Sequence, residues 1–256
     1  MVRRSLASVV TLLIAALGIG CGSSTPKGGG NPAYVRVRGT NRVFVYTLNG
    51  GGGLKAVSKS PFVTGTSPSA VAVHPSGKFV FVANSADSTV WVYTVDSTGG
   101  LTQASQTTVG LNPSALVIDA GGNLLFVANE GSDSVAGYSI DSSTGALTPV
   151  AGSLVSTSSP VALALAPSGK FLYVANANTA SISGFSVSAG ALVPLTGLPL
   201  AVGANPSSSA IDEGGRFLYV SSVAASALWG FSIDASSGAV TLVHHRHSAL
   251  VRTPWA

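Results

Sequence analysis

Six polar residues stand at, or just after, the end of short apolar runs. They are three asparagines and three acids: Asn84, Asp87, Asn129, Glu130, Asp133 and Asn176. Amides and carboxylates that converge on one place can bind a ligand, and a carboxylate beside a water molecule can act as a general base. The same residue types also close turns through hydrogen bonds between side chain and backbone. We treat the six as candidate ligand-binding residues, with turn formation as the alternative.

One segment has the composition of a metal site. HHRH spans residues 244–247, and on a strand His245 and His247 would point to the same face. Neutral imidazoles suit zinc or copper, but two ligands do not complete such a site. The segment also falls on a strand expected at the outer edge of its sheet. We therefore predict no metal and no cofactor.

The candidate residues belong to a repeat. Its register is marked by Pro68, Pro113, Pro160, Pro206 and Pro254, with spacings of 45, 47, 46 and 48 residues. Each copy holds four short strand signals separated by turns such as HPSGK and DAGGN, in which glycine supplies positive φ angles. No helical periodicity separates the strands, which excludes a parallel sheet with helical crossovers.

This pattern predicts an all-β fold, a β-propeller built from four-stranded antiparallel blades. The runs FVFVA and VWVY are apolar throughout, as expected of strands covered on both faces by neighbouring blades. We assign residues 33–68 to a partial blade that lacks its first strand. Full blades are expected at 69–113, 114–160, 161–206 and 207–254, which makes about five blades.

Three motifs resemble the YVTN-type propeller repeat: FVAN at 81–84, FVAN at 126–129 and YVAN at 173–176. The whole period is similar to that of the lactonase family of seven-bladed propellers, which includes propeller-type 6-phosphogluconolactonases. The resemblance covers residues 33–256 and implies a ring of seven blades and a lactone-hydrolysing activity. WD-repeat propellers match less well, because no Gly-His or Trp-Asp pair recurs.

The number of repeats differs from that family pattern. The copies supply 19 predicted strands, whereas seven blades need more than about 300 residues. The resemblance therefore implies that blades are missing at the C-terminal side, or that the ring closes through a partner chain. An open arc would expose the faces of its terminal blades, so we expect it to aggregate or to pair end to end.

An antiparallel blade has two ends with different turns. The turns between strands two and three, and the links between blades, lie at one end, which we call the mouth-side end; all six candidates fall there. Lactone hydrolysis requires a base and an oxyanion donor, and a phosphorylated substrate adds a Lys or Arg clamp. Yet His74, Lys78, Lys170 and Arg216 fall in turns at the opposite end, and no cation of the repeats is expected at the mouth-side end.

Catalytic residues remain unassigned, because no local motif matches one of the family. Glu130 is the candidate that differs most between copies, since Ser85, Ala177 and Val223 occupy its position elsewhere.

The first 21 residues predict an export signal. Arg3 and Arg4 precede an apolar run of about 15 residues, too short to span a bilayer. Small residues lead to Cys21, the only cysteine, at the place where a lipoprotein signal is cut and the cysteine acylated. An ordinary cleaved signal is the alternative. Residues 22–32 form a Gly/Ser/Pro tether, so we expect a lipid-anchored domain at the cell envelope, on the outer membrane or periplasmic side in a two-membraned cell.

The formal net charge of +4 is unevenly distributed. Residues 43–243 carry five Lys or Arg against all nine carboxylates, so this part is weakly acidic. Nucleic-acid binding needs clustered basic residues on the folded domain, so we exclude nucleic acid as a partner.

Two functional hypotheses follow. The first is an exported binding module for an unknown small ligand or protein, attached to the membrane through its lipid. The second is a lactonase-type hydrolase whose active site is incomplete in this chain. Fold alone does not decide between them.

Overall fold

The computed structural model describes residues 32–37, 39–48 and 53–247. These residues form five antiparallel sheets, blades 1 to 5 in chain order, which confirms the predicted all-β propeller architecture. Within them no helix has the length and apolarity that a membrane span requires. The predicted signal, Cys21 and most of the tether lie outside the described residues.

The strands of the blades have the following bounds. Blade 1 contains β1 (Pro32–Val37), β2 (Arg42–Leu48), β3 (Leu54–Ala56) and β4 (Phe62–Val63). Blade 2 contains β5 (Pro68–Val73), β6 (Phe79–Asn84), β7 (Thr89–Val95) and β8 (Leu101–Thr108). Blade 3 contains β9 (Pro113–Ile118), β10 (Leu124–Asn129), β11 (Ser134–Ile140), β12 (Leu147–Pro149) and β13 (Val155–Ser156), with a 3-10 turn, η1 (Glu130–Ser132).

Blades 4 and 5 complete the set. Blade 4 contains β14 (Pro160–Leu165), β15 (Phe171–Asn176), β16 (Ser181–Ser188), β17 (Ala191–Pro194) and β18 (Leu200–Ala201). Blade 5 contains β19 (Pro206–Ile211), β20 (Phe217–Ser222), β21 (Ala227–Ile233) and β22 (Val240–His247).

The outer strands differ from the sequence-based expectation. In blades 1, 3 and 4 the outer strand is interrupted, so that β3 and β4, β12 and β13, and β17 and β18 each share one neighbour. The described residues therefore hold 22 strand segments instead of the 19 strands predicted. Blade 1 has its second, third and outer positions filled, as expected for a copy that begins at strand two.

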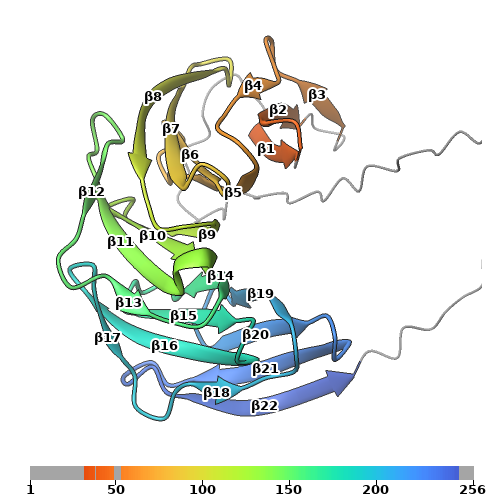
Figure 1. Ribbon diagram of the computed structural model, residues 1–256, viewed down its shortest axis with the longest axis vertical. Coiled ribbons are helices and arrows are strands. Elements are labelled where there is room, and N and C mark those ends of the chain that lie inside the picture. Colours follow the sequence, from red (N-terminus) through yellow and green to blue (C-terminus); the bar gives the residue numbers. More distant parts are fainter. Residues whose placement is uncertain (1–31, 38, 49–52, 248–256) are drawn as a thin grey trace, which may run out of the picture.

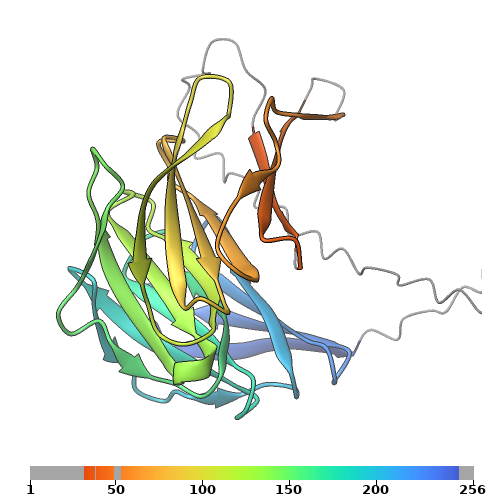
Figure 2. The ribbon, with the colours of Figure 1, turned by 45° about the horizontal axis from the view of Figure 1, so that its top comes forward.

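Figure 1 shows the five sheets arranged around a central axis as an arc. The inner strands β5, β9, β14 and β19 lie side by side near that axis. Figure 1 shows a gap between the red-orange strands of blade 1 and the blue strands of blade 5, and Figure 2 shows the same strands in a view turned by 45°. The described chain is thus an arc with two terminal blade faces.

Each pair of adjacent blades shares one apolar core, so there are four cores along the arc. Strand β15 shows how a strand serves two of them. Its Phe171 and Tyr173 pack toward blade 5, whereas the alternate Leu172 packs toward blade 3. Successive side chains of a strand point to opposite faces, so a strand between two blades must be apolar on both.

The links between blades repeat one backbone geometry. The residue before each of the four described register prolines has a positive φ, with values from 49° to 56° at Ser67, Asn112, Ser159 and Asn205. The carbonyl of each of these residues accepts a hydrogen bond from the first amide after strand two, for example from Glu130 N to Asn112 O at 3.0 Å. This contact fixes each link against the 2–3 turn of its own blade.

Candidate functional site

The three asparagines end the second strands of blades 2, 3 and 4 and lie opposite the register prolines. Asn84, Asn129 and Asn176 are at most 1% exposed. Asn84 Oδ1 accepts a hydrogen bond from Thr64 Oγ1 at 2.9 Å, and Asn176 Nδ2 donates to Ser183 Oγ at 2.9 Å. This burial favours the turn-forming interpretation over a role as freely accessible rim residues.

The acids at the mouth-side end hold the links between blades. Asp87 Oδ2 accepts a hydrogen bond from Thr66 N, and Asp133 Oδ1 accepts one from Ser159 N at 2.6 Å. Both aspartates are exposed. In blade 3 the position of Asp87 is filled by Ser132, whose Oγ accepts a hydrogen bond from Leu111 N at 2.6 Å. A hydroxyl thus performs the task of the carboxylate.

Glu130 connects two links rather than one. Its Oε2 accepts a hydrogen bond from Asn112 Nδ2 at 3.1 Å, and its Oε1 accepts one from Ser159 Oγ at 3.3 Å. Asn112 precedes blade 3 and Ser159 precedes blade 4. Glu130 is therefore a bridge across blade 3, which the shorter side chains at its position in the other copies cannot form.

The proline carbonyls at the same end join neighbouring blades. Ser69 Oγ of blade 2 donates to Pro113 O, and Ser114 Oγ of blade 3 donates to Pro160 O at 2.6 Å. In blade 1, Arg36 Nη1 donates to Pro68 O at 3.3 Å. Sequence reasoning missed these contacts, although the recurring Pro-Ser pair marks two of them.

Arg36 also corrects the expectation that no cation of the repeats lies at the mouth-side end. It stands near the end of β1, the second strand of its blade, and Arg42 begins the third strand at the same end. Arg42 is exposed, and Arg36 is partly buried. The alignment of AYVRV with strand two already places Arg36 at this end of blade 1.

His74, at the opposite end, is a structural residue in this fold. It is 7% exposed, and its Nε2 lies 2.8 Å from Gly122 O of blade 3. Since a carbonyl accepts, Nε2 carries the proton, and Nδ1 accepts from Ser76 N at 3.1 Å. The ring stands edge-on to Phe79. His74 therefore ties blade 2 to blade 3.

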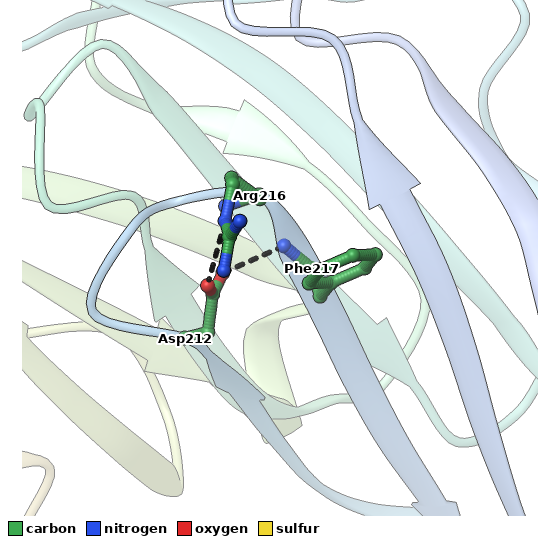
Figure 3. A network of polar contacts seen from close by, with 3 residues as sticks. All are labelled: Asp212, Arg216 and Phe217. Carbon is green, nitrogen blue, oxygen red and sulfur yellow. Dashed lines mark hydrogen bonds and ion pairs between the residues drawn. The ribbon is translucent and has the colours of Figure 1, made fainter.

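The cations of the 1–2 turns lie at that opposite end, as predicted. Lys78, Lys170 and Arg216 are exposed. Figure 3 shows Asp212 accepting from the amide of Phe217 and pairing with the Arg216 guanidinium, with Arg216 Nε 3.5 Å from Asp212 Oδ2. The hydrogen bond from Phe217 N and the interactions with Arg216 lower the pKa of Asp212. An exposed pair of this kind shapes a turn and adds little stability.

Hollows along the described part of the arc include the following two. The first, which we call the channel hollow, has a volume of about 380 Å³ and lies between the last residues of β5, β9 and β14, bordered by Asp119 and Pro75. The second, the side hollow, has a volume of about 500 Å³ and lies beside β11 where the outer strand of blade 3 is interrupted. Gly110, Asn129 and Ser132 border the side hollow, so residues of the mouth-side end contribute to it.

The HHRH segment forms the end of β22, and the orientation of its side chains lies outside what the structure describes. Within the described part of the chain, no three His, Cys, Asp or Glu side chains are grouped closely enough to hold a metal ion.

Comparisons with known proteins agree with this architecture. A family model described as "Lactonase, 7-bladed beta-propeller" matches residues 25–163 and 150–253. No curated protein matched the sequence. Similar solved structures include a protein from Lactobacillus plantarum, with a TM-score of 0.77 and 23% identity, which covers 84% of this chain and 67% of its own.

Two further structures have similar folds. A Bacteroides uniformis protein that carries the provisional name 6-phosphogluconolactonase has a TM-score of 0.75 at 18% identity, covering 86% of this chain and 69% of its own. The periplasmic gluconolactonase of Pseudomonas aeruginosa has a TM-score of 0.71 at 22% identity, covering 84% and 67%. At these identities the likeness concerns the fold, and the chain spans about two thirds of each protein. The family match, which extends over nearly all of the blades described above, shows that this chain belongs to the lactonase family of seven-bladed β-propellers.

Proposed function

We propose that this protein is an exported, lipid-anchored member of its family that acts as a binding module for a small ligand or a protein. The observation that carries the proposal is the hydrogen bonding of the Glu130 carboxylate. Both of its carboxylate oxygens accept hydrogen bonds from the links on either side of blade 3. A base must be within hydrogen-bond reach of the proton that it removes, and here the carboxylate is held by the chain's own loops.

The other acids at the mouth-side end support the same proposal. Asp87 and Asp133 each accept a backbone amide of a link. Fixed links give a rigid surface of loops, which favours recognition because few side chains must be ordered when a ligand binds. Such a surface suits a binding module better than a site that moves a proton.

A lactone hydrolase is the second candidate. It is favoured by Arg36 and Arg42, two cations at the same end of the blades as Glu130, and by the family to which the chain belongs. A cation at that end could stabilise a developing oxyanion or hold an anionic substrate.

The export part of the proposal rests on residues 1–21 and on Cys21 as the acylated N-terminus. A relative of similar fold is named as periplasmic, which is compatible with action at the envelope.

One set of measurements tests both parts. The full chain, produced in a bacterium fed a fatty-acid analogue, should be labelled, and Cys21→Ser should abolish the label. The purified protein should show no saturable hydrolysis of 6-phosphogluconolactone or gluconolactone. Saturable hydrolysis that Glu130→Gln abolishes, and that the exposed control Glu213→Gln leaves intact, would establish the hydrolase instead.

A further inference from the structure

The side hollow lies at a position of strand three that other blades fill with an aromatic ring. Phe44 of blade 1, Trp91 of blade 2 and Trp229 of blade 5 stand two residues after the start of strand three, each opposite a valine of strand two. Ala136 has this place in blade 3, opposite Val127, and it borders the hollow. Blade 3 therefore has a methyl group beside an open space where three other blades have a ring.

Blade 2 shows how a ring lies at this position. Trp91 packs on the core shared by blades 1 and 2 and stands beside Tyr93, with ring centroids 6.3 Å apart and ring planes inclined by 36°. Aromatic pairs favour centroid separations of about 4.5–7 Å. Tyr138 corresponds to Tyr93, faces the same side of its strand as Ala136, and borders the hollow. A ring from outside the chain can thus lie beside Tyr138 as Trp91 lies beside Tyr93.

The hydroxyl group of Tyr138 is available to a ligand. In blade 2, Tyr93 Oη donates a hydrogen bond to Val63 O of blade 1 at 2.8 Å. Tyr138 Oη has no hydrogen-bond partner among the described residues, and unlike Tyr34 Oη it is not shut off from solvent. This oxygen can therefore accept a hydrogen bond from a donor in the hollow.

Asn129 also borders the hollow, but it does not contribute a contact. Its Oδ1 has no partner, because Val109 stands where Thr64 donates to Asn84 Oδ1 in blade 2. The same oxygen is shut off from solvent, so a ligand in the hollow cannot reach it. The polar contact is therefore assigned to Tyr138.

The outer wall of the hollow is apolar and uncharged. It contains Pro149, Val150 and Leu154, and Leu154 is 71% exposed. Ser153 lies in the same loop, but its hydroxyl already donates to Val150 O at 2.7 Å. No residue that borders the hollow is an acid or a cation. A charged group would lose hydration there without gaining a counter-charge, whereas a neutral ring buries apolar surface.

A small residue at this position would not by itself indicate a site. Ser183 has the corresponding place in blade 4, but its Oγ accepts a hydrogen bond from Asn176 Nδ2 at 2.9 Å, and it borders neither hollow described above. In blade 3 the small residue coincides with a space of about 500 Å³. Small-molecule sites occupy about 300–1,000 Å³.

We propose that the side hollow of blade 3 binds an uncharged small molecule with a planar aromatic ring, which lies beside Tyr138 and donates a hydrogen bond to its Oη. The inference rests on the proposed binding function and names its ligand class. It places the ligand beside β11, apart from the channel hollow, with which the side hollow shares no bordering residue.

Ligand-observed NMR and calorimetric titration of the full chain test the proposal with indole as the probe. N-methylindole lacks the N–H donor, and cyclohexanol carries a donor on a non-planar ring. We expect indole to bind, and N-methylindole to bind about fivefold to tenfold more weakly, the effect of about one hydrogen bond. Cyclohexanol should also bind more weakly than indole. Failure of both indoles to bind, or equal binding of cyclohexanol, would overturn the inference.

Three variants locate the binding. Ala136→Trp gives blade 3 the residue that blades 2 and 5 carry, and it should weaken indole binding at least about tenfold, because the new ring fills the hollow. Tyr138→Phe removes only the acceptor, so it should weaken indole about fivefold to tenfold and leave N-methylindole unchanged. Tyr93→Phe, the same change in blade 2, should leave the binding of both unchanged. Should Ala136→Trp not fold, Tyr138→Phe still decides.

The outcomes separate this inference from the proposed function. If indole binds equally well to Ala136→Trp, Tyr138→Phe and the wild type, the site lies elsewhere; the inference then fails while the binding module stands. If neither indole binds and lactones are hydrolysed, both fail. N-acetyl-L-tryptophanamide presents the ring as a peptide does. If it binds more than about tenfold more tightly than indole, the ring belongs to a partner protein and the small-molecule inference is contradicted.

Discussion

Asp141 and Asp234 occupy the same position in the 3–4 turns of blades 3 and 5. Oδ1 of Asp141 accepts four hydrogen bonds, from the amides and hydroxyls of Ser143 and Thr144 at 2.6–3.0 Å. Asp234 is bonded in the same way to Ser236 and Ser237. Hydrogen bonds to the ionised form, first those of the Ser143 and Ser236 hydroxyls, hold the pKa of each carboxyl well below its ordinary value.

These two turns should make stability depend on acid pH. Because each folded-state pKa is lowered, the contribution is fully present above the unfolded pKa of about 3.9 and is lost as the pH falls below it. We expect the Tm of the wild type to fall as the pH drops below about 4. The double variant Asp141→Asn/Asp234→Asn should have a lower Tm at neutral pH and a flatter decline.

Differential scanning calorimetry across this pH range measures the effect. Glu213→Gln, which alters an exposed carboxylate in a 1–2 turn, should behave as the wild type. Parallel Tm curves for the double variant and the wild type would contradict the assignment.

The places of single residues also show how much of the site the sequence could predict. The acids were expected in turns, and they are there, because short polar side chains beside glycine close turns by local hydrogen bonds. The buried state of Asn129 and its missing partner were not predictable. They depend on Val109 and on the loop around Ser153. The fold brings both close to Asn129, whereas the repeat pattern gives no sign that they lie near it.

At the scale of elements, the 3–4 turns of blades 3, 4 and 5 each pack on strand two of the preceding blade. A Cβ on Gly238 of blade 5 would lie 2.4 Å from Phe171 Cδ1 of blade 4, and one on Gly145 of blade 3 would lie 2.8 Å from Phe79 Cδ1 of blade 2. Tyr173 Oη of blade 4 donates to Gly238 O at 2.7 Å, and burial raises the pKa of Tyr173 to about 12. The turn glycine therefore allows close contact between blades.

Gly238→Ala should destabilise the protein more than the same change at Gly169. Both glycines have a positive φ, of 72° and 70°, so each alanine costs about 1–2 kcal/mol for its backbone conformation. A Cβ at Gly169 meets nothing within 4 Å, whereas one at Gly238 meets Phe171. Overpacking adds about 1–3 kcal/mol at Gly238. Urea unfolding of the two variants gives the difference; equal losses would show that the contact relaxes freely.

The elements themselves were largely predictable from the sequence. The inner strands of blades 2 to 5 begin one residue before the predicted starts of these blades, because apolar runs, register prolines and turn glycines agree. The interrupted outer strands were not predicted. The sequence pattern assigns one outer strand to each blade. Only packing against the neighbouring strand shows that Leu198 of blade 4 lies against Gly184, whereas the side hollow lies beside β11 in blade 3.

At the scale of the whole molecule, blade 5 carries the apolar face that every earlier blade gives to its successor. Phe171 and Tyr173 of blade 4 are covered by blade 5. The corresponding residues of blade 5 are Phe217 and Tyr219, and Tyr219 is 41% exposed. Leu228, opposite Ser221 on the same face, is 49% exposed. The face of blade 5 that carries Phe217, Tyr219 and Leu228 therefore corresponds to a face that the following blade buries in the earlier copies.

We therefore expect this 256-residue chain to self-associate through that face. Exposed apolar patches on stable monomers are seldom larger than a few hundred Å², and an uncovered blade face is of the kind that neighbouring blades normally bury. Tyr219→Lys/Leu228→Lys should shift the protein toward monomer, because two cations on the face oppose its burial. Leu111→Lys, at a more exposed leucine on a link between blades, should not. Sedimentation velocity over a range of concentrations measures the shift; a wild type that stays monomeric throughout would show that blade 5 is stable with its face in water.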